Sequence, residues 1–229
     1  MAQELGRVQR PSVGQYRGKR KLLLVPLMYP PYDAEEGLAI LEKFWEQVRT
    51  QTNALESSLG ALRHIYCESL AVGGAEGLKH LELADQRSHS FVQAKCDAGA
   101  VLEPTENEEA LAEILDLQRF LVLPLASEKV ARRVREWFTE SNKSRYEHIA
   151  HQIDTTLKED EAGLLLISER HQVQFPPDIE VFYVAPPALD EFRRWLQNWV
   201  ERQRQKANKS DESEASGTEE GTDADPPTK

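Results

Sequence analysis

Apolar residues in this chain fall into short unbroken runs and into longer stretches with helical spacing. The runs "KLLLVPLM" at 21–28, "GLLLIS" at 163–168 and "DIEVFYV" at 178–184 are typical of strands that are buried on both faces. After the first run, residues 35–59 repeat apolar positions every three or four residues. That spacing predicts a helix of about seven turns.

The rest of the chain continues this alternation with weaker signals. Further strands are predicted at 63–70, 90–96 and 119–125, and further helices at 73–84, 106–118, 127–157 and 187–205. Thr105 and Glu108 have the spacing of a capping box, which predicts a helix start after Thr105. The stretch 127–157 can be one helix or two, with "SNKS" at 141–144 as the expected break.

The order of these elements predicts an α/β fold, with helices flanking a mainly parallel or mixed sheet. A mixed sheet is the stronger expectation, because the second run starts ten positions after the first one ends at 168, which is enough for a hairpin. "HQVQF" at 171–175 could add a short extended piece there. Residues 164–167 and 181–184 lack polar alternation, so we expect both to be central strands.

The two ends of the chain differ from its middle in composition. Residues 1–20 form a basic leader that we expect to be flexible, and residues 206–229 hold seven acidic residues against three lysines. Because residues 206–229 lack aromatic and branched aliphatic side chains, they predict a disordered acidic tail. The α/β domain then spans 21–205, with two subdomains at about 21–125 and 126–205 as an alternative.

The charge of the chain restricts its partners. The net charge is −11 and the part without the tail is also acidic, so duplex nucleic acid is not expected to bind the whole surface. The leader is the exception, because Arg7, Arg10 and Arg17 make it a candidate contact for RNA or a ribonucleoprotein. A flexible, solvated leader is the simpler interpretation of the same residues.

The location of the protein is predicted from two absences. No apolar run approaches the roughly 20 residues of a membrane span, and no export signal precedes the first strand, so we expect a cytoplasmic protein without membrane contact. Cys67 and Cys96 lie in apolar stretches, which fits reduced, buried thiols better than a disulfide.

Carboxylates stand at the ends of several predicted strands. Glu68, Glu103 and Glu169, together with His171, are the candidate catalytic residues, because ligands of open α/β sheets gather beyond the carboxyl ends of the strands. The same three glutamates and Glu106 are candidate ligands of a divalent cation, the one cofactor that we consider. In a chain this rich in acidic residues, acids also fall at strand ends by chance.

Two further motifs carry weaker signals. "VGGAEGL" at 72–78 could bring backbone amides close to a phosphate, but Glu76 would repel an anion, so a tight turn is the better interpretation. His148 and His151, with Glu147, could share one helix face as metal ligands, but their spacing matches no zinc-protease motif. A solvated helix face is the better interpretation of these residues.

Short stretches of the sequence resemble known proteins. The phrases "HIYCESL", "GAVLEPTENEEALAEILD" and "HQVQFPPDIEVFYVAPPALDEFRRWL" resemble an uncharacterised bacterial family with no assigned activity. "RYEHIAHQIDTTLKEDEAGLLLISE" is similar to a helix-then-strand element in the C-terminal domain of archaeal and eukaryotic peptide-chain release factors. The glycine-glycine-glutamine tripeptide of those factors is absent, since 73–75 reads "GGA", so the resemblance does not imply peptide release.

Two classes of function remain open on the sequence alone. The first is a non-catalytic, cytosolic binding or regulatory protein, associated with RNA or the ribosome through its leader. The second is a metal-dependent hydrolase that uses the strand-end carboxylates. We prefer the first, because no catalytic motif is complete.

Overall fold

The structure is a computed structural model that describes residues 16–31 and 34–216. Its helices and strands follow one another as β1 (Arg20–Leu27), α1 (Glu35–Leu59), β2 (Leu62–Cys67), α2 (Gly74–Ala84), α3 (Gln86–Asp97), β3 (Val101–Glu103), α4 (Glu108–Leu121), α5 (Glu128–Thr156), β4 (Ala162–Ser168), β5 (Ile179–Tyr183) and α6 (Pro187–Ser216). The protein is therefore of the α/β class, as the sequence predicts.

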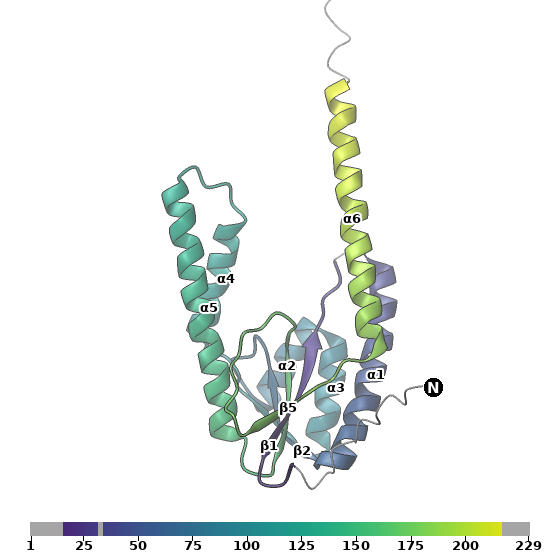
Figure 1. Cartoon of the computed structure of the whole chain (residues 1–229), viewed down its shortest axis with the longest axis vertical. Coiled ribbons are helices and arrows are strands. Elements are labelled where there is room, and N and C mark those ends of the chain that lie inside the picture. Colours follow the sequence, from purple (N-terminus) through teal and green to yellow (C-terminus); the bar gives the residue numbers. More distant parts are fainter. Residues whose placement is uncertain (1–15, 32–33, 217–229) are drawn as a thin grey trace, which may run out of the picture.

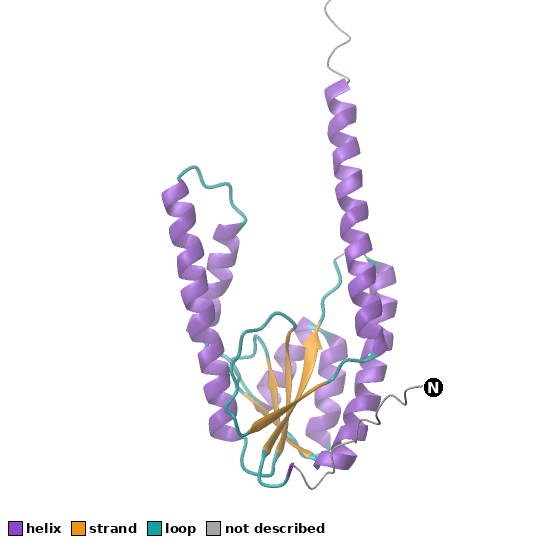
Figure 2. Ribbon diagram, viewed as in Figure 1, coloured by secondary structure: helices purple, strands orange, loops and turns teal. Residues whose placement is uncertain are grey.

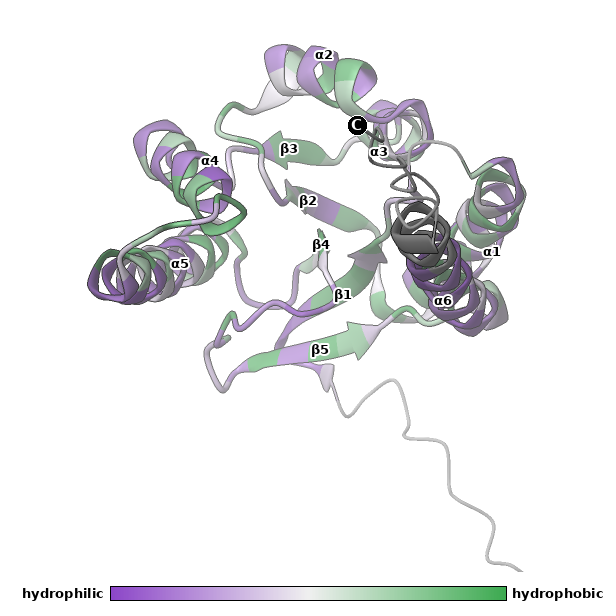
Figure 3. Cartoon of the chain, turned by 90° about the horizontal axis from the view of Figure 1, so that it is seen from above, coloured by the Kyte–Doolittle hydropathy of each residue, from purple (hydrophilic) through white to green (hydrophobic). Residues whose placement is uncertain are grey.

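The strands form a single five-stranded sheet in the order β3-β2-β4-β1-β5, and every neighbouring pair is parallel. β4 lies between β1 and β2, so the sheet joins strands from both halves of the chain. Viewed from above, α1, α2, α3 and α6 cover one face, whereas α4 and α5 lie on the other (Figure 3).

The larger core fills the face covered by α1, α2, α3 and α6. Leu23 of β1 and Leu164 of β4 are almost completely buried there against Phe44 and Trp45 of α1 and Phe91 of α3. These aromatic side chains contact one another, with ring centroids of Phe44 and Phe91 each 5.5 Å from that of Trp45. Burial of this apolar surface is the main force that holds the layers together.

The opposite face has a smaller core that only one helix covers. Ile149 and Ile153 of α5 pack on Leu22 of β1 and Leu165 of β4, and Val173 from the loop before β5 completes the layer. Because side chains alternate between the faces of a strand, neighbouring residues such as Leu22 and Leu23 belong to different cores.

Two helical segments project beyond the sheet on either side of it (Figures 1 and 2). The first is the antiparallel hairpin of α4 with the N-terminal half of α5, and the second is the distal part of α6. The carboxyl ends of the strands point into the space between these segments (Figure 2).

The predicted strand at 90–96 is wrong, because this segment belongs to α3. The Asp85 side chain accepts a hydrogen bond from the Ser88 amide and caps the helix. Phe91, Val92 and Lys95 then share the buried helix face, a spacing that "SFVQAKC" also allows. The third strand is instead the short β3.

Two predictions around α4 are also wrong. The expected strand at 119–125 is the end of α4 and the turn that follows it. The helix cap is Asn107, whose side chain accepts from the Ala110 amide at 3.0 Å, and not Thr105. Thr105 Oγ1 accepts from the Cys67 amide at 3.0 Å and ties the strand ends together.

The expected break at 141–144 is absent, since α5 is one continuous helix.

The prediction of a mixed sheet with a hairpin before β5 is wrong as well. β5 pairs in parallel with β1 and lies at the edge of the sheet, so it is not a central strand. Val181 and Tyr183 are 42% and 46% exposed, and residues 171–175 form no strand. β4 is central, as predicted.

The ends of the domain differ slightly from the predicted boundaries. β1 begins at Arg20, and Tyr16 packs on Phe182 with ring centroids 5.1 Å apart, so the last residues of the expected leader contact the domain. α6 continues to Ser216, within the stretch assigned to the tail. The rest of the leader and of the tail, residues 1–15 and 217–229, lies outside the described residues.

Candidate functional site

The strand-end residues meet where the connections of the sheet change direction. From β2 the chain continues outward to β3, whereas from β4 it crosses β1 to reach β5. Neighbouring strands whose connections leave in opposite directions leave a crevice at their carboxyl ends, where open α/β sheets bind ligands. In this chain the crevice lies between the ends of β2 and β4.

Glu68 follows β2 and bridges this crevice. Its Oε2 accepts from the Ser168 amide at 2.5 Å, and its Oε1 accepts from Ser168 Oγ at 3.1 Å. The Glu68 amide in turn donates to the Leu166 carbonyl at 2.8 Å. The carboxylate therefore closes the end of the β2–β4 ladder and lies at the switch point itself.

Arg145 neutralises part of the charge at this point. Its Nη2 donates to Glu68 Oε1 at 3.1 Å, and its Nε donates to both oxygens of Glu106 at 2.9 Å. Glu106 also accepts from the Ser69 amide at 3.0 Å. The side chains of Glu106 and Arg145 are only 1% and 8% exposed, so this is a buried, hydrogen-bonded ion pair.

The cluster of Glu68, Glu106 and Arg145 anchors the projecting hairpin. Glu106 lies just before α4, Arg145 lies where α5 leaves the sheet, and Glu68 ends a strand of the sheet. Removing either partner of such a pair would leave a buried charge without a counter-charge. The anchor thus fixes the base of the hairpin to the end of the sheet.

Glu103 has different partners from the other strand-end carboxylates. Its Oε1 lies 2.8 Å from His64 Nδ1, and Glu161 Oε2 lies 3.3 Å from Nε2 of the same ring. The His64 ring also stacks on Tyr66 with centroids 6.3 Å apart. Glu103, the last residue of β3, is therefore part of a partly buried cluster that is separate from the anchor.

Glu169 and His171 lie on the turn after β4, as predicted. Glu169 pairs with Arg193 of α6 and accepts from the Tyr183 hydroxyl at 3.4 Å. His171 Nδ1 accepts from the Val173 amide at 3.3 Å, and partial burial lowers the pKa of the imidazole while Glu68 opposes that shift. The turn is exposed at Glu169 and half-buried at His171.

The four strand-end glutamates thus do not share one site. Glu68 and Glu106 come together, but around a guanidinium, whereas Glu103 and Glu169 pair elsewhere. Within 16–31 and 34–216, no group of three or more His, Cys, Asp or Glu side chains is arranged to hold a metal ion. Glu68, Glu103 and Glu169 therefore do not form one catalytic or metal-binding cluster.

The weaker motifs have structural explanations. A Cβ on Gly73 would lie 2.5 Å from the Leu102 carbonyl oxygen, so the glycine allows the turn to pack against β3. His151 is exposed on α5, and Glu147 forms an ion pair with Lys143 at 3.8 Å. These features agree with a tight turn and a solvated helix face.

Arg145 is the residue that sequence reasoning missed. Its partners are 39 and 77 residues away, so no local motif contains them. One signal was present, because Arg145 occupies the apolar stripe of its helix, four residues before buried Ile149. A charged residue at such a position predicts a buried partner.

The cations next to the leader are also paired. Arg20 donates to Asp178 at 2.7 Å and to Asp154 at 2.7 Å, and Lys19 forms an ion pair with Glu180. Lys21 Nζ donates to the Asp160 carbonyl at 3.0 Å. This pairing weakens the case for RNA contact through Lys19, Arg20 and Lys21, whereas Arg17 is exposed and Arg7 and Arg10 lie outside the described residues.

The distal end of the α4–α5 hairpin exposes apolar and basic side chains together. The end of α4 and the turn that follows it read Phe120-Leu121-Val122-Leu123-Pro124-Leu125, and Val122 is 81% exposed. The first turns of α5 add Lys129, Arg132 and Arg133, which are all exposed. We call residues 119–133 the hairpin tip.

Searches for relatives leave the chain without neighbours. No family model matches it, and neither the curated proteins nor the solved structures contain a match. Among the helices in the described part of the chain, none combines the length and the apolar character that crossing a bilayer requires.

Proposed function

We propose that this chain is a non-catalytic, cytosolic binding protein that contacts RNA or a ribonucleoprotein through the hairpin tip. The observation that carries this proposal is the exposure of cations and a contiguous apolar turn at the end of an anchored helical hairpin. Neither group contributes to a core, and contiguous apolar surface exposed in this way is typical of contact sites.

The charge distribution favours a polyanion at the tip. Exposed cations such as Lys129 and Arg132 attract phosphates, and an otherwise acidic surface would repel the same partner elsewhere. Arg132 and Arg133 each lie near Glu136, at 3.9 and 3.3 Å, but exposed ion pairs of this kind are weak and leave the guanidinium available. The tip is therefore the better candidate than the leader.

The apolar turn favours a ribonucleoprotein over RNA alone. The side chains of Val122 and Leu123 have no hydrogen-bond donor or acceptor. Burying them against a protein surface therefore yields more free energy than contact with phosphates. A metal-dependent hydrolase is the weaker alternative, because it requires strand-end carboxylates that are available to a metal ion. Glu68 and Glu106, two of these carboxylates, instead pair with Arg145.

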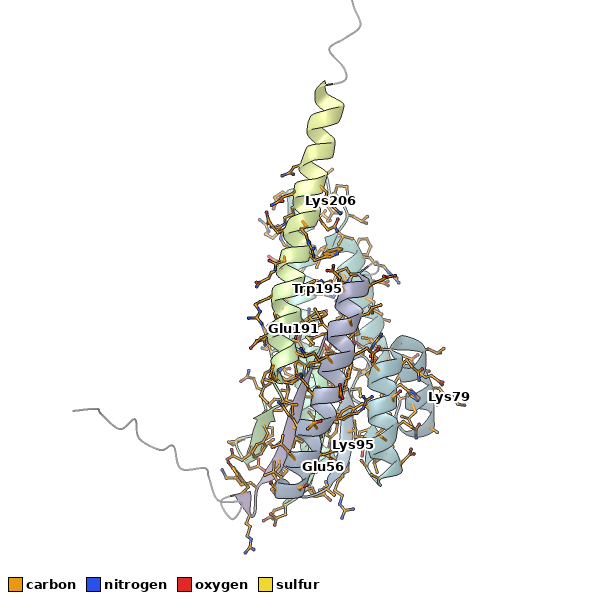
Figure 4. The ribbon with its side chains drawn as sticks, turned by 90° about the vertical axis from the view of Figure 1, so that its right-hand side faces the viewer. Glu56, Lys79, Lys95, Glu191, Trp195 and Lys206 are labelled. Carbon is orange, nitrogen blue, oxygen red and sulfur yellow. The ribbon has the colours of Figure 1, made fainter. Side chains whose placement is uncertain are left out.

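Binding to a short, fluorescein-labelled single-stranded RNA and co-sedimentation with purified ribosomes test the proposal. We expect R132Q/R133Q to weaken RNA binding and to reduce the slope of log K against log salt by about 1.4. V122S/L123S should weaken ribosome binding more than RNA binding. K79Q is the matched control, because exposed Lys79 lies on α2, away from the tip (Figure 4).

Absence of binding to both RNA and ribosomes at low salt would refute the proposal. Equal binding by the wild type and both tip variants would also refute it, because contact would then be made by another surface.

A further inference from the structure

A cavity of about 90 Å³ lies at the switch point, on the face of the sheet opposite the hairpin. Leu27, Cys67 and Leu166, from the ends of three adjacent strands, form its apolar floor. Residues of α2 and α3 form the roof. The crevice beyond the carboxyl ends of parallel strands is where this class of fold binds ligands.

Polar groups converge on the same cavity. Glu68 lies on its wall, Asp85 and His80 contribute from the helical side, and Tyr29 lies at the opening with 64% of its surface exposed. An apolar pocket with a few convergent polar groups is the usual form of a small-molecule site. The larger hollow of about 680 Å³ between α1 and α6 is more open, and Glu36 and Arg202 on its walls are 3.6 Å apart and pair with each other.

The charge on the wall of the cavity is not balanced by the residues around it. Glu68 and Glu106 share the single guanidinium of Arg145, which leaves one negative charge in excess. Asp85, which caps α3, does not supply the missing positive charge, and Arg87 at 3.7 Å from it also pairs with Glu42 at 2.6 Å. A largely buried charge is stable when a counter-charge or hydrogen bonds compensate it.

Glu68 retains room for one more donor. A carboxylate has about four acceptor positions, and Arg145, the Ser168 amide and the Ser168 hydroxyl occupy three of those on Glu68. The Tyr29 ring at the opening could also attract a cation through its face.

We propose that this cavity binds a small primary ammonium compound, with the ammonium group donating to Glu68 and a short apolar stem on the floor. The cavity volume of about 90 Å³ is smaller than the roughly 150 Å³ of a cavity that holds benzene, which limits the stem to about two to four carbons. For a ligand of so few atoms, Kd is expected on the order of 0.1–1 mM.

The test uses n-propylammonium chloride and its neutral analogue 1-propanol, each titrated into the full-length, isotope-labelled protein. Amide NMR signals of Glu68, Ser69 and Leu70, which line the cavity, should shift and saturate with propylammonium. 1-Propanol can still donate a hydrogen bond to Glu68 but carries no positive charge, so it should bind about 10- to 100-fold more weakly.

Two variants locate the binding. A84L should fill the cavity and abolish the saturable shift, whereas A75L makes the same change on the same helix outside the cavity and should leave it intact. E68Q should bring the two probes to similar affinity, provided that its NMR spectrum shows a folded domain.

Three results would overturn the proposal: no saturable shift with propylammonium, equal binding of 1-propanol by the wild type, or unchanged binding by A84L. Because A84L leaves the charge of Glu68 in place, the last result would apply even if E68Q did not fold.

Discussion

Arg145 Nε donates to both carboxylate oxygens of Glu106 at 2.9 Å, which joins the middle of α5 to the residue two positions before α4. The pair of Glu106 and Arg145 is buried, and Glu68 is the third residue of this anchor. Glu68, a catalytic candidate in the sequence, and Glu106, a candidate metal ligand, therefore hold a helical hairpin in place.

Replacing Arg145 by methionine should destabilise the protein by about 3–5 kcal/mol, because two carboxylates at the anchor would lose their shared counter-charge. Urea unfolding monitored by circular dichroism gives this value. R133M is the matched control on the same helix and should stay within about 0.5 kcal/mol, since Arg133 is exposed. A loss below about 1 kcal/mol for R145M would mean that the anchor does not fix the hairpin.

Leu166 and Val181 should differ strongly in their effect on stability. Leu166 lies in central β4 and is fully buried, so L166A should cost about 2–5 kcal/mol. Val181 lies on edge strand β5 and is partly exposed, so V181A should cost about 1 kcal/mol or less. Equal losses in urea unfolding would contradict the position of β5 at the edge.

The Cys67 thiol should be unreactive in the folded protein. Complete burial raises its pKa far above the usual value, and partial burial also raises the pKa of Cys96. Only the thiolate reacts rapidly with disulfide reagents. In native protein at pH 8, C96S should therefore release almost no thionitrobenzoate, whereas the same variant in denaturant should react with one equivalent of reagent.

His171 should make the protein less stable as the pH falls from about 7.5 to 5.5. Its pKa in the folded state is below the usual 6.5, because partial burial disfavours the charged ring. In this window the unfolded chain binds a proton that the folded chain binds less readily, so acidification favours unfolding. The H171Q variant should show a smaller change in urea midpoint over the same pH range. An NMR titration that places the pKa of His171 above 6.5 would contradict this prediction.

Much of the fold follows from local sequence patterns, and the errors have physical causes. β1, β4 and α1 were predicted because each follows from a local pattern. The two strands follow from the apolar runs at 21–28 and 163–168, and the helix follows from the helical spacing at 35–59. The apolar spacing of "SFVQAKC" fits a strand or a helix, and the N-terminal cap that the Asp85 side chain provides favours the helix. Whether a strand is central or at the edge depends on pairing partners far along the chain, which explains the error at β5.

The site was less predictable than the fold for the same reason. Position after a strand singled out Glu68, which lies at the switch point of the sheet, but it gave equal weight to Glu103, which pairs with His64 instead. The guanidinium that brings Glu68 and Glu106 together comes from the middle of a helix, and no spacing in the sequence links it to either of them.

The position of β4 between β1 and β2 also constrains how the protein is made. When residues 1–161 have left the ribosome, β1 and β2 are present but the strand that joins them is not. The nascent chain then exposes unpaired backbone edges of both strands, which β4 covers only after residues 162–168 emerge. Contacts between residues so distant in sequence slow folding, and exposed strand edges promote aggregation. Synthesis of this chain should therefore depend on chaperones that bind extended apolar segments until the central strand arrives.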